Sequence, residues 1–324
     1  MAASCQTVEQ TLADVISWRP VLEPVLRAFE PLLTAQAQLA EDLAQNPRAH
    51  APALPELNTD RARQGISLLT DAGLSGAAAP LRDSAERLLP LLEKLEFLAP
   101  HMPALTACFL RPVETVSSEN ADRPEDIREE LVRALIAGNR EALARIARDS
   151  DLDPLVLEFV AGFIVAPVLR AMVAQALSGE GQGPWNEGDV WQQGYCPVCG
   201  TLPSIGWLDK PMLDEKNAFL AGGGGKKHLH CGLCGANWKY RRGACPACEQ
   251  EGSGVIEILR ESGPSHGERL DWCTKCKTYC PTVDLREREF IPNLEAASIG
   301  MMHMDMVAAR KKLHPLKPSF WNTF

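Results

Sequence analysis

Four C-x-x-C pairs are the part of this sequence best suited to chemistry. Two thiolates separated by two residues can bind one ion, and two such pairs supply the tetrahedral set of four sulfurs that suits zinc or a single iron. The segments between successive pairs are 31, 10 and 24 residues long, and joining consecutive pairs predicts two metal ions per chain. The expected ligand sets are Cys196, Cys199, Cys231 and Cys234, and Cys245, Cys248, Cys273 and Cys276. A cross-braced arrangement, in which the first pair joins the third, stays open because the spacing does not exclude it.

The residue after each pair affects how the chain turns around the ion. Gly200 and Gly235 follow the first two pairs, where glycine lets backbone N–H groups turn toward the sulfurs, whereas Glu249 and Lys277 follow the other two. A cysteine-rich region of about 100 residues has too little apolar mass for a large core of its own. Bound metal is therefore expected to supply folding free energy on the order of 10 kcal/mol per site.

The remaining cysteines and the nearby histidines are expected to lie outside the ligand sets. Cys5 and Cys108 have no paired neighbour at ligand spacing. Cys280, close behind the last pair, is expected to be a spare thiol, with a role as substitute ligand left open. His228 and His230 share one face of the strand that enters the second pair. We expect them to be ordinary strand residues, with a hydrogen bond to a ligand sulfur as the alternative.

Hydrophobic periodicity changes near residues 179–185. Before this point apolar residues recur at helical spacing. Asp153 followed by Pro154 is typical of a helix start, and the helix is expected to end at Gly179. The other stripes cover 22–43, 81–95 and 131–146, the last interrupted at 138–139, with loops expected at 46–58 and 117–123.

After residue 184 the helical period gives way to short alternating runs. The runs 237–240 and 255–259 predict strands, and the glycines at 222–225 predict a hairpin tip. The section 292–313 is again helical, and the tail from residue 314 is expected to lie against the body without an element of its own. The face expected for this last helix holds Ile299, Met302, Met306 and Ala309.

These patterns together predict an α+β protein in three parts. An all-α helical bundle covers residues 1–183, and a first rubredoxin-like or zinc-ribbon-like module covers 184–240. A second such module, with a C-terminal helix and tail, covers 241–324.

Composition and charge restrict the function. The net charge of −9 is uneven: up to Pro184 there are 16 Lys and Arg against 26 Asp and Glu, which leaves +1 for the remainder. A basic run with interleaved aromatics, 226–242, suits a nucleic-acid-binding ribbon, but the patch is brief and the chain is acidic as a whole, which disfavours nucleic acid as the partner. A redox protein using the metal or thiols is the other alternative, although no βαβ pattern surrounds the pairs. We find no G-x-S-x-G, phosphate loop or H-E-x-x-H motif, so no enzyme activity is predicted.

Apolar content indicates a protein outside the membrane. The longest uncharged part of the most apolar stretch, 159–169, has 11 residues, whereas a bilayer span needs roughly 20. The first residues show no basic and then apolar signal pattern. We therefore expect no membrane insertion and a cytoplasmic location. Because the cytoplasm is reducing, the cysteines are expected to bind metal and not to form disulfides.

The cysteine region resembles the formate dehydrogenase accessory proteins, the FdhE family. The matching segments are Y-C-P-V-C-G-T-L-P at 195–203, L-H-C-G-L-C at 229–234, Trp238, C-P-A-C-E-Q at 245–250 and C-T-K-C-K-T-Y at 273–279. The segment 209–225 is longer than expected for the family. The resemblance implies a cytoplasmic, non-enzymatic assembly protein that contacts the catalytic subunit of formate dehydrogenase during its maturation. It also favours rubredoxin-like iron, with zinc as the alternative.

Overall fold

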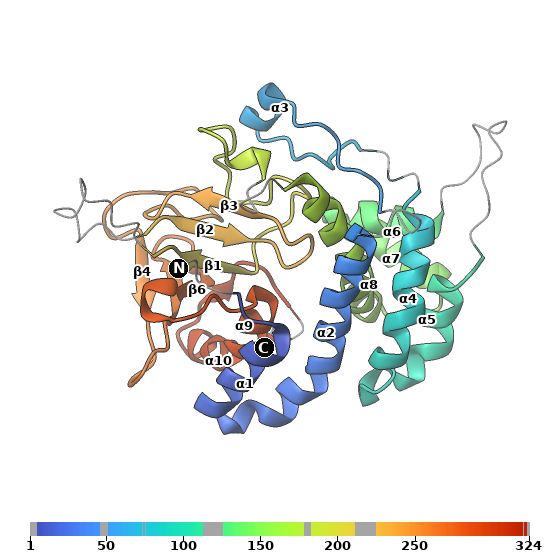
Figure 1. Cartoon of the computed structure of the whole chain (residues 1–324), viewed down its shortest axis with the longest axis horizontal. Coiled ribbons are helices and arrows are strands. Elements are labelled where there is room, and N and C mark those ends of the chain that lie inside the picture. The colour runs from blue at the N-terminus through green and yellow to red at the C-terminus, as the bar shows by residue number, and fades with distance from the viewer. Residues whose placement is uncertain are drawn as a thin grey trace.

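A computed structural model gives the arrangement of most of the chain. It describes residues 5–45, 51–72, 74, 76–112, 126–177, 183–210, 225–319 and 321–322. Helices form the part before residue 177, and one β-sheet with its own helices forms the part after residue 183 (Figure 1). The predicted α+β class is therefore confirmed. The loop expected at 117–123, most of the glycine-rich tip at 222–225 and most of the long segment 209–225 lie outside the described residues.

Helix α8 (Pro154–Ala176) is the central helix of the helical part. The Asp153 side chain accepts hydrogen bonds from the N–H groups of Leu155 and Val156 at its start, as the sequence indicates. It packs against α2 (Glu23–Gln45) and α4 (Ala78–Leu92). By length and composition α8 could cross a membrane, but 72% of its most apolar window is buried inside the protein. Its apolar surface is explained by the helices around it.

The other helices of this part are short. Helices α6 (Ile127–Ile136) and α7 (Arg140–Asp149) are separated at Gly138 and Asn139, where the sequence predicts a break. The Asn139 side chain accepts a hydrogen bond from the N–H of Ala142, which starts α7. The remaining elements are α1 (Val8–Trp18), η1 (Pro20–Leu22), α3 (Thr59–Arg63), η2 (Glu96–His101) and α5 (Met102–Phe109).

One sheet runs through both cysteine modules. Its strand order is β3-β2-β1-β6-β5-β4, and neighbouring strands within each module are antiparallel. Strands β1 and β6 join the modules in parallel, with Gly206 opposite Thr282. A Cβ at Gly206 would lie 3.2 Å from the Thr282 hydroxyl and 3.3 Å from the His228 carbonyl oxygen, so the close approach of three strands favours glycine here. The strands are β1 (Ile205–Leu208), β2 (Lys227–His230), β3 (Asn237–Tyr240), β4 (Ile256–Leu259), β5 (Glu268–Cys273) and β6 (Thr278–Asp284).

The first helix of the chain packs against a helix that follows the sheet. Helices α9 (Leu294–Gly300) and α10 (Met302–Arg310) follow β6 and the short η5 (Leu285–Glu287), and α1 packs against α9 (Figure 1). The Thr11 hydroxyl accepts a hydrogen bond of 2.9 Å from the N–H of Asn293. The predicted domain boundaries at residues 183 and 240 stay predictions. The hydrogen bond between Thr11 and Asn293 joins the first predicted part to the third.

The C-terminal section differs from the prediction of one helix over 292–313. The chain leaves helical geometry at Met301, which separates α9 from α10 and shifts the phase of the second helix. From the break to the end of α10 the buried side chains are Met301, Met304, Asp305 and Ala308, whereas Met306 is 54% exposed. The face predicted from Ile299, Met302, Met306 and Ala309 is therefore wrong at Met306 and Ala309, which are exposed, whereas Met302 is half-buried and packs against the main core.

The tail also forms an element that the sequence did not predict. Residues His314 and Pro315 make a short strand, β7, that pairs in parallel with the start of β6. The N–H of Leu316 donates to the Tyr279 carbonyl oxygen, and the Leu316 side chain is buried. Further on, the Trp321 ring meets Phe29 of α2 edge-on at 6.2 Å. The tail thereby links the sheet to the helical part.

A buried carboxyl in α10 makes stability depend on pH. Burial raises the pKa of Asp305 from 3.8 to about 6, although the Tyr279 hydroxyl donates a hydrogen bond of 2.7 Å to it. The folded protein therefore keeps a proton that the unfolded chain releases, and this contribution to stability is lost as pH rises from about 4 to about 6. Asp305→Asn should raise the free energy of unfolding by on the order of 2 kcal/mol at pH 8. Denaturant unfolding of both proteins between pH 5 and pH 8 measures the difference.

The exposed Glu257 of β4 provides the matched control for Asp305. Glu257→Gln should change stability by less than about 0.5 kcal/mol at any of these pH values. A stabilisation by Asp305→Asn that stays constant from pH 5 to pH 8 would contradict a titrating buried carboxyl.

Candidate metal centres

The four C-x-x-C pairs fold into four turns of the same kind. In each turn the residue after the second cysteine donates its N–H to the carbonyl oxygen of the first cysteine, at 2.8–3.0 Å. That residue has a positive φ in every case, a conformation that glycine adopts most readily. Glycine is present at this position in the first two turns only. In the other two turns a residue with a side chain adopts the positive φ, which is strained. The φ values are +77° at Gly200, +74° at Gly235, +59° at Glu249 and +62° at Lys277.

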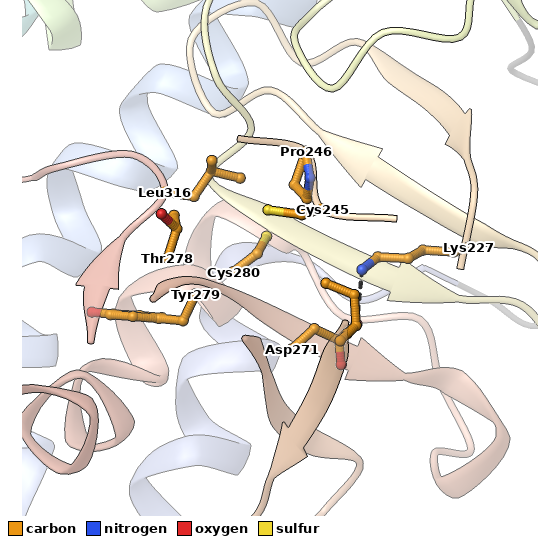
Figure 2. A pocket seen from close by; sticks show the side chains of 9 residues that line it. Lys227, Cys245, Pro246, Asp271, Thr278, Tyr279, Cys280 and Leu316 are labelled. Atoms are coloured by element: carbon orange, nitrogen blue, oxygen red, sulfur yellow. Dashed lines mark hydrogen bonds and ion pairs between the residues drawn. The ribbon is translucent and has the colours of Figure 1, made fainter. Parts of the chain in front are cut away.

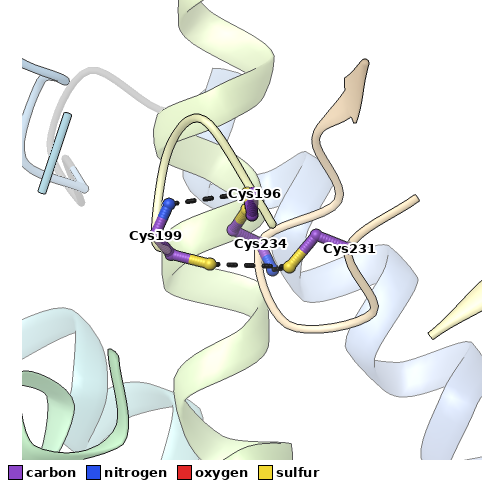
Figure 3. Close-up of side chains that lie close together, drawn as sticks. All are labelled: Cys196, Cys199, Cys231 and Cys234. Atoms are coloured by element: carbon purple, nitrogen blue, oxygen red, sulfur yellow. Dashed lines mark hydrogen bonds between the residues drawn. The ribbon is translucent and has the colours of Figure 1, made fainter. Parts of the chain in front are cut away.

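The first two turns bring four buried sulfurs together. Cys196 Sγ lies 3.4 Å from Cys234 Sγ, and Cys199 Sγ lies 3.5 Å from Cys231 Sγ (Figure 3). The Thr201 hydroxyl lies 3.2 Å from the sulfurs of both Cys199 and Cys231. Backbone N–H groups of the turns also point at the sulfurs at 3.4–3.5 Å. We call this cluster the first centre.

The other two turns form a second centre from Cys245, Cys248, Cys273 and Cys276. Cys245 Sγ lies 3.6 Å from Cys276 Sγ, and Cys248 Sγ lies 3.7 Å from Cys273 Sγ. The sulfur of Cys276 lies 3.3 Å from the hydroxyl of Thr278, a contact that repeats the role of Thr201. The structure thus groups consecutive pairs in both centres, and the cross-braced arrangement is not the one observed.

The geometry of both centres suits a metal ion and not disulfides. The four sulfurs of each centre all lie within 4.8 Å of one another. A tetrahedron of sulfurs about 2.3 Å from a central ion has edges of about 3.8 Å, close to the separations observed. A disulfide needs about 2.05 Å, and all eight cysteines are free. Four sulfurs fit zinc and rubredoxin-like iron equally, and assignment of these cysteines as ligands stays a prediction.

The raised pKa values of two thiols in the first centre also indicate that a cation is needed for these thiols to ionise. Burial raises the pKa of Cys196 and of Cys234 well above the ordinary value, so without a cation these thiols stay protonated. At the second centre burial likewise raises the pKa of Cys276, but hydrogen bonds with Thr278 and with the neighbouring thiols outweigh it and lower that pKa to about 7. A divalent ion would stabilise the thiolates that ligation requires.

The helical part holds the first centre from one side. The Ser67 hydroxyl donates to the carbonyl oxygen of Cys196 at 2.8 Å, and the N–H groups of Leu68 and Leu69 donate to the carbonyl oxygens of Pro197 and Val198 at 2.9 Å. These hydrogen bonds attach the first turn to residues that lie about 130 positions earlier in the chain.

Helix α8 holds the second turn of the first centre. Its Arg170 donates to the carbonyl oxygen of Gly232 at 2.7 Å and pairs with Glu295 of α9 at 3.4 Å. Glu295 also lies 3.2 Å from Nε2 of His230, whose Nδ1 is 3.1 Å from Asn237. Burial opposes ionisation of Glu295, but Arg170 and His230 outweigh it and hold the pKa of Glu295 well below the ordinary value. A buried charged group therefore joins α8, β2 and α9 beside the first centre.

The expectation of ordinary strand histidines agrees with these contacts. His228 stacks on Trp207 with ring centroids 4.1 Å apart, and its Nε2 lies 3.0 Å from Asp209. The hydrogen bonds described for His228 and His230 are to oxygens, not to ligand sulfurs.

The three other cysteines lie outside both centres. Cys5 is exposed, and Cys108 is buried in α5, 3.7 Å from the Ser150 hydroxyl. Cys280 is buried in β6, and its side chain lines a cavity of about 10 Å³ together with Cys245 and the buried Lys227 (Figure 2). It is not among the sulfurs grouped in the second centre, so a role as substitute ligand receives no support.

The basic run over 226–242 does not form an exposed stacking surface. Trp238 is fully buried and Tyr240 is 7% exposed, so neither ring is open to a base. Lys227 is buried as well and forms an ion pair of 2.8 Å with Asp271 of β5. The two aromatic rings and Lys227 therefore belong to the sheet interior, whereas the other Lys and Arg residues of the run are exposed.

Several residues of the site were missed from the sequence. Thr201 and Thr278 each follow a second cysteine by two positions, a repeat that the sequence contains and that would have revealed them. Ser67, Arg170 and Glu295 have no such local signal, because only the tertiary fold brings them to the first centre.

Comparison with known proteins adds the family context. No protein-family model matches the chain. A curated FdhE homolog of Aquifex aeolicus is 27% identical over 135 residues, covering 41% of this chain and 44% of that protein. FdhE of Escherichia coli strain K12 is 23% identical over 204 residues, covering 63% of this chain and 55% of that protein. The crystal structure of FdhE from Pseudomonas aeruginosa matches with a TM-score of 0.58 and 21% identity, over 96% of this chain and 93% of that one.

This chain resembles FdhE proteins in sequence and in fold. The resemblance predicted from the cysteine motifs is thus confirmed. The chain spans about half the length of the curated FdhE proteins it matches. The structural likeness to FdhE of Pseudomonas aeruginosa establishes the fold.

Proposed function

We propose that this chain is a cytoplasmic accessory protein for the maturation of a molybdenum- or tungsten-dependent formate dehydrogenase. It acts without catalysing a reaction, through contact with the catalytic subunit. The similarity to FdhE proteins, together with two four-sulfur centres in the region of the motif match, supports this proposal.

The contact surface follows from charge and from the placement of the centres. The turns of the second centre expose Ala247, Glu249, Lys275 and Lys277, and the helical part up to Pro184 carries a net charge of −10. An acidic surface attracts a basic segment of an immature partner and speeds their encounter. Binding of this kind is expected to be reversible, because an assembly protein must release its client.

A deletion experiment tests the proposed function. Without this protein, the catalytic subunit of formate dehydrogenase should accumulate but show a strong loss of specific activity. Formate oxidation and molybdenum or tungsten content are measured on the subunit purified from cells with and without the gene.

Complementation supplies the control. The chain with Cys5→Ser should restore activity, because Cys5 is exposed and lies outside both centres. Equal specific activity of the subunit from deleted and intact cells would reject the accessory role.

A further inference from the structure

We infer that the two centres have different tasks: the first is a permanent joint between helices and sheet, and the second is an exchangeable metal site. This rests on the proposed binding of metal by both cysteine groups. It concerns how firmly each group holds its ion and what unfolds when the ion leaves.

Exposure is the first difference between the centres. All four cysteines of the first centre are at most 2% exposed. At the second centre Cys245 and Cys273 are buried to the same degree, but Cys248 and Cys276 are only half-buried. One ligand from each turn of the second centre therefore faces solvent, where a competing ligand can approach the ion.

Attachment is the second difference. The first turn is bonded to Ser67, Leu68 and Leu69, and the second turn is bonded to Arg170 of α8. The cysteines of both turns belong to the same hydrophobic core as the helices. Figure 3 shows a helix passing directly behind these four cysteines. Opening the first centre therefore requires separating the sheet from the helical part.

The second centre has a small core of its own. Cys245, Val255 and Cys273 form it, with Cys248, Ile256 and Cys276 packed around them. The Tyr240 hydroxyl of β3 donates to the carbonyl oxygen of Cys245, and the Thr274 hydroxyl donates to the carbonyl oxygen of Gly254, which precedes β4. Within the described part of the chain, no hydrogen bond connects residues 245–250 or 273–277 to the helices α1–α8.

Local opening governs how fast each ion is lost. Regions with few buried contacts open at far lower free energy than a shared core. The half-buried Cys248 and Cys276 can leave the ion one at a time while the strands β5 and β6 stay paired. We therefore expect a chelator to remove the second ion at least about tenfold faster than the first, with the helices still folded.

Metal release from the zinc-loaded protein tests this inference. The full chain, containing two zinc ions, is mixed with excess EDTA, and free thiols are trapped with iodoacetamide at increasing times. Zinc remaining on the protein, helical circular dichroism and the alkylated cysteines identified by peptide mass spectrometry are followed together. We expect one zinc to leave first, with an unchanged helical signal and with alkylation confined to Cys245, Cys248, Cys273 and Cys276, apart from the exposed Cys5, which reacts at all times.

Variants assign the two steps. Cys248→Ser should abolish the fast step and retain one slowly released zinc, whereas Cys5→Ser should keep both steps. Release of both ions in one step, earlier alkylation of Cys196, Cys199, Cys231 or Cys234, or loss of helical signal in the fast step would overturn the inference. A purified chain that binds no zinc or iron would refute the metal binding itself. A chain that shows both steps without supporting formate dehydrogenase would refute only the proposed function.

Discussion

Replacing Cys276 by serine is expected to reduce the metal content from two ions per chain to one. The serine hydroxyl is a poor ligand for a soft or borderline metal, and the remaining three sulfurs leave the tetrahedral set incomplete. A structural zinc site supplies free energy on the order of 10 kcal/mol, so much of that stabilisation of the second centre is lost. Metal analysis of protein purified under reducing conditions gives the stoichiometry. A red colour with sulfur-to-metal charge-transfer absorption would identify iron, and a colourless protein zinc.

Cys280→Ser is the matched control for this prediction. Cys280 lies four positions after Cys276, in β6; it is buried and lines the cavity beside Cys245 without joining the second centre. The variant should keep both ions. A loss of metal from Cys280→Ser equal to that from Cys276→Ser would show that the ligand assignment of the fourth pair is wrong.

The local parts of this fold could be predicted from the sequence because they depend on residues close together in the chain. The strand at Asn237–Tyr240 and the helix start at Asp153 agree with the structure, and the cysteine spacing anticipated the turns of both centres. The choice between consecutive and cross-braced pairing needed the structure, since either fits the spacing. Backbone conformation was predictable where glycine marks it, but Glu249 and Lys277 adopt the same left-handed turn without that signal.

Features that depend on residues far apart in the sequence could not be predicted from hydrophobic periodicity. A helical pattern continues smoothly through Met301, yet the chain turns there and places Met304 inside and Met306 outside. The parallel pairing of β1 with β6 joins segments about 75 residues apart and makes one sheet of the two modules. The difference between the centres has the same origin, because Ser67 and Arg170 reach only the first of them through the tertiary fold.

Replacing Glu295 by glutamine is expected to weaken the joint at the first centre by about 3–5 kcal/mol. Glu295 neutralises Arg170 at 3.4 Å and contacts His230 at 3.2 Å, and the side chains of all three are at most 16% exposed. The amide keeps the size of the carboxylate but leaves the Arg170 guanidinium without its negative partner in a poorly hydrated position. Arg170 in turn holds the second turn through the carbonyl oxygen of Gly232, so the weakening should reach the metal site. Denaturant unfolding followed by helical circular dichroism measures the cost.

Glu261→Gln is the control that separates burial from charge. Glu261 also forms an ion pair with an arginine, Arg19, at 2.9 Å. The Glu261 side chain is 46% exposed, so water screens the attraction between the two charges. Its loss should cost less than about 1 kcal/mol. Release of the slowly exchanging zinc should accelerate in Glu295→Gln and stay unchanged in Glu261→Gln, because only Glu295 is connected to a turn of the first centre. Equal destabilisation by the two variants, or an unchanged release rate in Glu295→Gln, would show that the buried charges do not support the first centre.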